Sequence, residues 1–263
     1  MLTYRGANLT EISIKKHALL LLHAFPLSAA MWQPQLEALG NAGVAVIAPN
    51  AYGIEGSEER NSWSFTDYAH ELAELLESLN IDRVTVAGLS MGGYQAFEFY
   101  RLYPQKTASL VLCDTRAEAD APEARSAREE FIRAIEAGGA EEAARRMIPN
   151  YFTVETSVEK PELAAEAAMM IKKQSATVIT AAMRAIMMRS DATPLLSVIG
   201  CPVLVLCGAA DKLTTPETAE SIHSLVPASQ LRLIAGAGHI SNMEQPEAFN
   251  SALLDHFKEV SRS

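Results

Sequence analysis

Hydrophobic residues in the first 115 positions follow two alternating patterns. Short continuous apolar runs, typical of strands buried on both faces, alternate with stretches that carry apolar residues at helical spacing. The runs predict strands over residues 10–22, 44–50, 83–90 and 107–115, and the helical spacing predicts helices over 29–42, 64–79 and 92–104. This alternation predicts an α/β fold, with a doubly wound parallel sheet covered by helices on both faces.

The same pattern resumes near residue 193. Two further strands are predicted over 201–211 and 229–238, and two helices over 216–226 and 246–260. The sheet-forming sequence is therefore split into two parts that we expect to join in one sheet.

The middle of the chain, residues 116–192, contains no strand-like run. It is rich in Ala, Glu, Arg and Met, and its helix breakers predict about four helices; the breakers lie near Pro122, Gly138-Gly139, Pro149 and Pro161. We expect a core formed by residues 1–115 and 193–263, with 116–192 inserted as an all-helical cap. A cap of this kind would lie over the carboxyl ends of the strands, where such sheets bind ligands.

Composition excludes several classes of partner. Hydrophobic residues make up 49% of the 263 residues, which is enough to fill a large core. The net charge of −10 argues against nucleic acid and anionic membranes, because both bind basic surfaces. No run approaches the roughly 18 apolar residues of a membrane span. Residues 15–30 resemble a leader peptide only faintly, and we expect a strand and a loop there.

Cysteine usage and motif spacing predict no cofactor. Cys113, Cys201 and Cys207 lie in strand-like apolar runs and are expected to be buried free thiols, which fits a reducing, cytoplasmic location. No cluster has metal-ligand spacing, and no glycine-rich stretch matches a nucleotide-binding motif. A monomer and a homodimer both remain open.

The sequence Gly88-Leu89-Ser90-Met91-Gly92 lies where a predicted strand meets a predicted helix. Glycines on both sides of the serine allow strand and helix backbones to approach closely. The serine hydroxyl is then exposed at the end of the sheet, beside the free N–H groups of the helix. Because a tight turn without chemistry would show the same glycines, the partners of Ser90 decide its role.

A base and an acid for this serine follow later strands. His239 lies in the loop "AGAGHISNMEQP", whereas His17 lies in a predicted strand and His70, His223 and His256 lie on predicted helices. Asp211 begins the loop after the preceding strand, and the order Ser90, Asp211, His239 is that of the α/β-hydrolases. Asp114, which follows the strand after Ser90, is a second candidate for the acid that we consider weaker.

An oxyanion hole needs two N–H donors. Met91 would supply one, since it follows the nucleophile. The second is expected from the loop His23-Ala24-Phe25-Pro26, which follows an earlier strand.

These motifs together resemble the α/β-hydrolase fold serine hydrolases, including carboxylesterases and enol-lactonases, over essentially the full length of the chain. "LLLHAFPLSAAMW" is similar to the family's His-Gly-x-Pro loop, which implies that the Phe25 N–H is the second oxyanion donor. "GLSMGG", "GAADKLTTP" and "GAGHISNMEQPEAF" resemble the nucleophile, acid and histidine loops. Ala24 replaces the usual glycine, and Asn50 and Glu55 depart from the family pattern in "VIAPNAYGIEGS".

The resemblance implies acyl transfer on small, fairly apolar esters or lactones, with Ser90 as nucleophile, His239 as base and Asp211 as orienting acid. A serine at this position argues against haloalkane dehalogenase and epoxide hydrolase activities, whose members of this fold use aspartate. The same triad could instead serve C–C bond hydrolysis, cofactor-free perhydrolysis (haloperoxidase-like) or a lyase reaction. A ligand-binding protein of this fold is the least favoured alternative.

Several apolar side chains are candidates for substrate contact. Phe25 and Trp32 lie near the oxyanion loop, although Trp32 fits the core equally well. Methionines on the predicted helices of the insertion could line a pocket or pack only among themselves; they are Met169, Met170, Met183, Met187 and Met188.

Overall fold

A central sheet organises the computed structural model, which describes residues 1–9 and 17–262. In this part of the chain seven strands are arranged in the order β1-β3-β2-β4-β5-β6-β7. Their bounds are β1 Tyr4–Ala7, β2 His17–Leu22, β3 Val46–Pro49, β4 Arg83–Leu89, β5 Thr107–Cys113, β6 Val203–Gly208 and β7 Ser229–Ile234. β1 is antiparallel to β3, and the other described pairs are parallel. The predicted doubly wound, mostly parallel sheet is confirmed.

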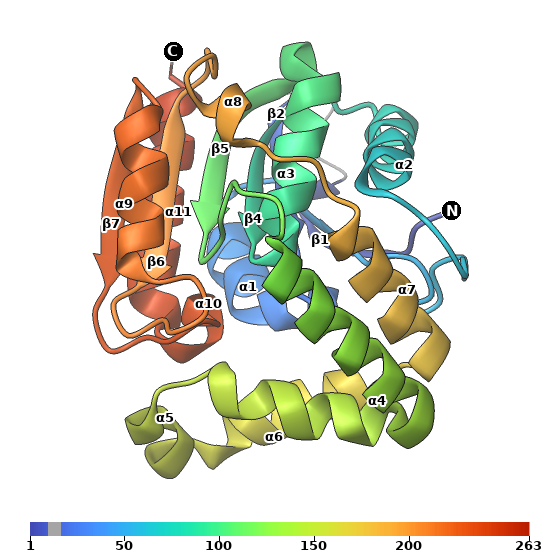
Figure 1. The fold of residues 1–263 in the computed structure, drawn as a ribbon. Coiled ribbons are helices and arrows are strands. Elements are labelled where there is room, and N and C mark those ends of the chain that lie inside the picture. The colour runs from blue at the N-terminus through green and yellow to red at the C-terminus, as the bar shows by residue number, and fades with distance from the viewer. Residues whose placement is uncertain (10–16, 263) are drawn as a thin grey trace.

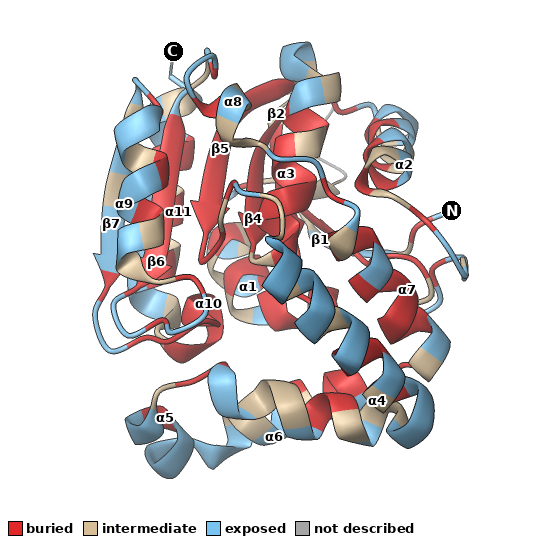
Figure 2. Ribbon diagram, viewed as in Figure 1, coloured by how far each residue is buried: buried red, intermediate tan, exposed pale blue. Residues whose placement is uncertain are grey.

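Helices cover both faces of this sheet (Figure 1). α1 (Gln33–Asn41) packs against α11 (Pro246–Val260) on one face, and α2 (Phe65–Ser78), α3 (Met91–Leu102) and α9 (Pro216–Leu225) cover the other. Two short helices, α8 (Thr193–Leu196) and α10 (Ser241–Glu244), complete this part of the chain. Figure 2 shows that the central strands are buried and that the outer faces of the helices are exposed, which explains the continuous apolar runs of the strands.

Helices fill the segment between β5 and α8. They are α4 (Pro122–Met147), α5 (Val154–Glu159), α6 (Pro161–Lys172) and α7 (Ala176–Met187). α4 bends at Gly139, which has a φ of 67° that glycine adopts without strain. Figure 1 shows α4, α5 and α6 beyond the ends of the strands. The division of the chain at residues 115 and 193 stays a prediction.

Some elements differ from the sequence predictions. The predicted helix over 29–42 divides into a 3-10 turn, Ala29–Trp32, and α1. β1 and α10 carry too few residues to show a period in the sequence. The first part of the predicted 10–22 strand, residues 10–16, lies outside the described residues.

Cys113 and Cys207 are buried in strands as expected, but Cys201 precedes β6 and is only partly buried. Within the described residues, none of the helices is long and apolar enough to cross a membrane.

The turn from β4 to α3 brings three backbone segments into contact. A Cβ atom on Gly88 would overlap the Gly92 carbonyl, and a Cβ atom on Gly92 would overlap the Leu22 carbonyl of β2. Ser90 between them has a φ of 57° and a ψ of −112°, a conformation that non-glycine residues rarely adopt. Both glycines are therefore required by the close packing of backbone on backbone.

Gly88→Ala tests this constraint. Because the new methyl group meets rigid backbone, we expect the free energy of unfolding to fall by about 3 kcal/mol, measured by urea denaturation. Gly200→Ala is the matched control, since the nearest atom to its added Cβ is the Tyr100 hydroxyl at 4.0 Å. Equal stability of the two variants would contradict the packing argument.

Candidate active site

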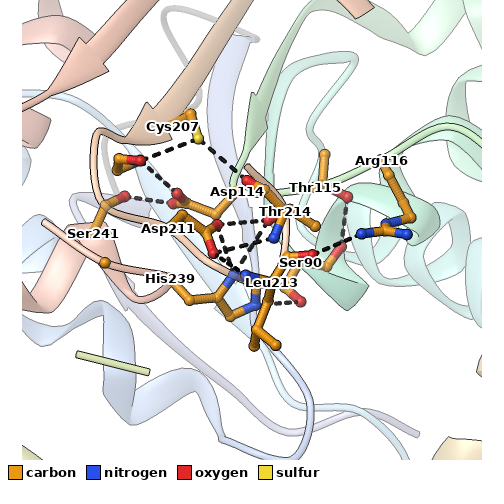
Figure 3. A network of polar contacts seen from close by, with 12 residues as sticks. Ser90, Asp114, Thr115, Arg116, Cys207, Asp211, Leu213, Thr214, His239 and Ser241 are labelled. Carbon is orange, nitrogen blue, oxygen red and sulfur yellow. Dashed lines mark hydrogen bonds and ion pairs between the residues drawn. The ribbon is translucent and has the colours of Figure 1, made fainter. Parts of the chain in front are cut away.

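Ser90 is held at the carboxyl end of β4 by contacts with the end of β5. Its N–H donates to the Cys113 carbonyl at 2.9 Å, and its carbonyl accepts the Thr115 hydroxyl at 2.8 Å. Thr115 in turn packs so closely on Gly93 that a Cβ atom there would overlap the threonine side chain. These backbone contacts leave the Ser90 side chain free to point out of the turn (Figure 3).

Ser90, His239 and Asp211 form one hydrogen-bonded chain, as their sequence positions predicted. Ser90 Oγ lies 2.9 Å from His239 Nε2, and His239 Nδ1 lies 2.9 Å from Asp211 Oδ2 (Figure 3). All three follow strands that end at the same edge of the sheet, because β4, β6 and β7 are parallel neighbours or near neighbours. The structure therefore brings together side chains that are far apart in sequence.

Several donors keep Asp211 ionised. Oδ1 accepts the Leu213 and Thr214 N–H groups at 2.8 and 3.1 Å, and Oδ2 accepts the Thr214 hydroxyl at 2.6 Å. Burial alone would raise the pKa of Asp211, but these donors and His239 hold it below its usual value. An ionised Asp211 accepts the Nδ1–H of His239, which leaves Nε2 as an acceptor for the Ser90 hydroxyl.

Asp114 makes different contacts. Its two carboxyl oxygens accept the Gly208 N–H at 2.7 Å and the Ser241 hydroxyl at 2.5 Å, and the structure gives it no hydrogen bond to His239. Burial, together with the nearby charge of Asp211, raises the pKa of Asp114 well above its usual value. The geometry thus favours Asp211 over Asp114 as the partner of the histidine.

One cluster in the described residues has the composition of a metal site. Asp114, Cys207 and Asp211 bring one potential ligand atom each to within 4.8 Å of one another, an arrangement that their sequence spacing did not indicate. Burial raises the pKa of the Cys207 thiol, which opposes the thiolate that metals bind. N–H and O–H donors from the protein occupy oxygens of both carboxyl groups. Hydrogen bonding within the protein therefore accounts for this cluster.

The buried side chain of His23 fixes the loop that carries Phe25 through two hydrogen bonds. Burial lowers the pKa of His23 to about 4, so that its imidazole is neutral. His23 Nε2 accepts the Ala51 N–H at 3.0 Å, which makes Nδ1–H the donor to the Ala24 carbonyl at 2.9 Å. Phe25 and Met91 line the same cavity as Ser90 and His239, in keeping with the positions expected for the two oxyanion donors.

The cavity beside Ser90 has a volume of about 350 Å³. Phe25 and Met183 line it, whereas Trp32 is fully buried and packs on Phe249 with ring centroids 5.9 Å apart. Trp32 therefore belongs to the core. Met169 and Met188 are exposed rather than directed into the cavity.

Tyr151, between α4 and α5, joins the two loops that carry Phe25 and His239. Its hydroxyl donates to the Phe25 carbonyl at 2.5 Å, and its own carbonyl accepts the Ile240 N–H at 3.1 Å. Its ring also lies beside the His239 imidazole, with centroids 6.2 Å apart. Sequence reasoning missed Tyr151, because nothing in a helical segment signals contacts with two distant loops.

Glu244 makes a second link of this kind. This fully buried carboxylate accepts the Thr153 N–H and hydroxyl at 2.8 and 2.6 Å through one oxygen, and the Gly238 N–H at 2.6 Å through the other. Thr153 is the N-cap residue of α5, and Gly238 directly precedes His239. The inserted helices are therefore hydrogen-bonded to the histidine loop.

Comparison with known proteins identifies the family. Residues 19–252 match the family model of the alpha/beta hydrolases. The chain belongs to the alpha/beta hydrolase family. A thermophilic esterase from Thermogutta terrifontis is 34% identical to it, with a TM-score of 0.93 and a match that covers 99% of this chain and 94% of the esterase. The resemblance seen in the sequence motifs is confirmed.

Other relatives in the family carry different names. The 3-oxoadipate enol-lactonase 1 of Acinetobacter baylyi is 27% identical over 227 residues, which cover 83% of this chain and 80% of the lactonase. A Mycobacterium tuberculosis protein provisionally named a non-heme bromoperoxidase is 28% identical over 243 residues, which cover 87% of this chain and 89% of that protein. Together the relatives support a hydrolase activity and leave the substrate of this alpha/beta hydrolase open.

Asp114→Asn tests the state of the buried carboxyl group. A group with a raised pKa in the folded protein contributes stability in full below its unfolded pKa, and loses it as the pH rises through the folded pKa. We expect the melting temperature of the wild type to fall relative to that of Asp114→Asn as the pH is raised above about 4. Thermal unfolding of both proteins from about pH 4 to neutral pH measures this difference. A difference that stays constant with pH would mean that Asp114 has an ordinary pKa.

Glu244→Gln tests the link between the inserted helices and the histidine loop. The amide replaces one acceptor by a donor, so that at least one buried N–H or O–H group loses its partner. We expect a loss of about 2 kcal/mol in the free energy of unfolding, measured by urea denaturation. The same change at the exposed Glu74 should alter stability by less than about 0.5 kcal/mol. A similar small effect at both positions would show that the link contributes little.

Proposed function

We propose that this alpha/beta hydrolase cleaves carboxylic esters or lactones through a covalent acyl-enzyme on Ser90. The observation that carries the proposal is the hydrogen-bonded chain from Ser90 Oγ to His239 Nε2 and from His239 Nδ1 to Asp211 Oδ2, each link 2.9 Å long. Ser90 and His239 line a cavity large enough for a small substrate. A nucleophile, a base within hydrogen-bond reach and an acid that orients the base are the groups that acyl transfer requires.

Each step follows from these positions. His239 takes the hydroxyl proton as Ser90 attacks the substrate carbonyl, and Asp211 stabilises the imidazolium that forms. The N–H groups of Phe25 and Met91 bind the oxyanion; Met91 is the first residue of α3, where backbone N–H groups lack helical partners. His239 then protonates the leaving alcohol. Water, activated by the same histidine, releases the acid and restores the Ser90 hydroxyl.

The inserted helices act as a cap over this cavity in the proposed mechanism. Phe131 and Met147 of α4 and Met183 of α7 line the cavity, so these helices would set the shape of the acyl or alcohol pocket. The proposal takes a small molecule as the substrate, without a nucleic-acid or membrane partner, and places the protein in the cytoplasm. The acidic net charge and the free cysteines support this part of the proposal.

Perhydrolysis is the second candidate. The M. tuberculosis relative named a bromoperoxidase favours it, and hydrogen peroxide would then replace water in attacking the acyl-enzyme. Because both reactions pass through the same acyl-enzyme on Ser90, the competing nucleophile distinguishes them. C–C bond hydrolysis and a lyase reaction would also use the triad, whereas a ligand-binding protein would show no turnover.

Active-site labelling and ester turnover test the proposal together. A fluorophosphonate should add once, at Ser90, as seen by intact-mass spectrometry, and 4-nitrophenyl esters of different chain lengths should be hydrolysed. We expect Ser90→Ala to abolish the adduct and to lower kcat by at least about 10⁴-fold. Labelling without ester turnover would favour the other reactions of the triad, and the absence of both would favour a binding protein.

The acid assignment has its own test. Asp211→Asn removes the carboxylate that accepts His239 Nδ1–H, so we expect kcat for 4-nitrophenyl butyrate to fall by about 10³- to 10⁴-fold. Asp114→Asn is the matched control, with an expected change of less than about tenfold, because Asp114 makes no hydrogen bond to His239. The reverse order of effects would assign the acid to Asp114.

A further inference from the structure

Two guanidinium groups line the largely apolar cavity beside Ser90. Arg116 follows β5, and Arg128 lies on α4. Apart from the His239 imidazole, the other ionisable groups among the described lining residues are the Asp120 carboxylate and the Tyr94 phenol. The chain as a whole has a net charge of −10, so an excess of positive charge around this cavity is a local feature.

Asp120 neutralises only part of this charge. Its side chain is buried and accepts Arg128 Nε at 2.6 Å and Arg189 Nη1 at 2.8 Å. Burial alone would raise the pKa of Asp120, but the two arginines hold it below its usual value. One ionised carboxylate therefore lies between two guanidinium groups, which leaves a positive charge in excess.

Arg128 has donors that the protein satisfies poorly. Its Nη1 reaches the Met183 sulfur at 3.4 Å, and its Nη2 lies 3.3 Å from Asp120 Oδ1, whereas its Nε has the short contact with Asp120. A thioether is a weak acceptor. The outer edge of this guanidinium is thus available, on a side chain that is 26% exposed and borders the cavity.

Arg116 has no acidic partner at ion-pairing distance in residues 1–9 and 17–262. Its Nη2 donates to the Leu213 carbonyl at 2.6 Å, and Figure 3 shows its guanidinium directed toward that loop. Arg116 also lines a second pocket together with Glu118, Asp120 and Glu217, and Ser90 is not among the residues that line that pocket. Most of the five N–H donors of Arg116 therefore remain for a ligand.

We propose that Arg116 and Arg128 bind a free carboxylate of the substrate. The substrate class is then a monoester of a short dicarboxylic acid rather than a wholly apolar ester. Guanidinium groups pair with carboxylates through two parallel hydrogen bonds, which fixes orientation as well as position. Hydrolysis would add water across the ester bond and release a dicarboxylate and an alcohol. This inference rests on the proposed function for its reaction, but not for its binding site.

An alternative role for these arginines is structural. Arg128 and Arg189 could serve only to tie α4 and the segment that follows α7 to the loop that contains Asp120. That role needs the contacts with Asp120, yet it gives no reason for Arg116 or for the free edge of Arg128 beside the cavity. It also predicts no preference between charged and neutral substrates, which makes the two roles separable.

A pair of isosteric substrates distinguishes the carboxylate-binding role of the two arginines from the structural role. Methyl hydrogen glutarate carries a carboxylate where methyl glutaramate carries a neutral amide of the same shape. We expect kcat/KM to be at least about tenfold higher for the carboxylate, mainly through KM, and the ratio to shrink with added salt. Arg116→Met and Arg128→Met should each bring the ratio close to one. Arg128→Lys, which keeps a charge without the paired donors, should give an intermediate ratio.

Arg125→Met is the matched control, because Arg125 lies one turn before Arg128 on α4 and is exposed. It should leave the ratio unchanged. An equal kcat/KM for the two substrates, or a ratio that survives both arginine substitutions, would overturn the inference. Failure to hydrolyse methyl hydrogen glutarate by a protein that does hydrolyse 4-nitrophenyl butyrate would also overturn it, while leaving the proposed function intact.

Binding without turnover distinguishes failure of the subsite from failure of the proposed function. Calorimetric titration of Ser90→Ala with methyl hydrogen glutarate and with methyl glutaramate measures the subsite directly. We expect heat of binding from the first and much weaker binding from the second, with the difference lost in Ser90→Ala/Arg128→Met. Selective binding by a protein that shows no ester turnover would support the subsite and refute the esterase. Equal binding of the two ligands would refute the subsite.

Discussion

Close backbone packing around Ser90 is the constraint on which the rest of the structure depends. The carbonyl groups of Gly92 and Leu22 occupy the space that Cβ atoms on Gly88 and Gly92 would need, so β2, β4 and α3 meet without intervening side chains. This contact forces Ser90 into its unusual backbone conformation. The central position of β4 in the sheet then supplies the rigidity that holds the conformation, because neighbouring strands pair with it on both sides.

Hydrogen bonding determines how the two buried acidic groups at this edge of the sheet differ. Asp114 and Asp211 are close enough for the charge of each to oppose ionisation of the other. Asp211 has three hydrogen bonds from the loop that follows it and a fourth to His239, whereas Asp114 has two from the protein. The negative charge therefore resides on the carboxylate that contacts the imidazole, and the neighbouring carboxyl group is driven toward its neutral form.

Sequence alone predicted the sheet, the order of its helices and the three side chains of the hydrogen-bonded chain. Ser90, Asp211 and His239 were predictable because each directly follows an apolar strand, and parallel strands end at the same edge. Tyr151 and Glu244 were not, because their contacts join segments that lie more than 85 residues apart in sequence. Arg128 was not predicted either, because its place beside the cavity depends on how α4 packs against α7. Helical periodicity shows which face is buried, but it does not show which partner covers that face.

The segment between β5 and α8 contacts the site in two ways: it hydrogen-bonds to the loops, and its side chains line the cavity. The reaction and the substrate are therefore predictable to different degrees. Hydrogen bonds from Tyr151 and Thr153 fix the loops around Phe25 and His239. Side chains of α4 and α7 instead form the wall of the cavity, where apolar residues surround a few charged groups. Substitutions on that wall can change what is bound without disturbing the hydrogen-bonded chain. Part of the cavity wall is thus formed by the segment whose sequence has the weakest motifs, so a proposal for the substrate must rest on charge and shape in the cavity rather than on the hydrogen-bonded chain.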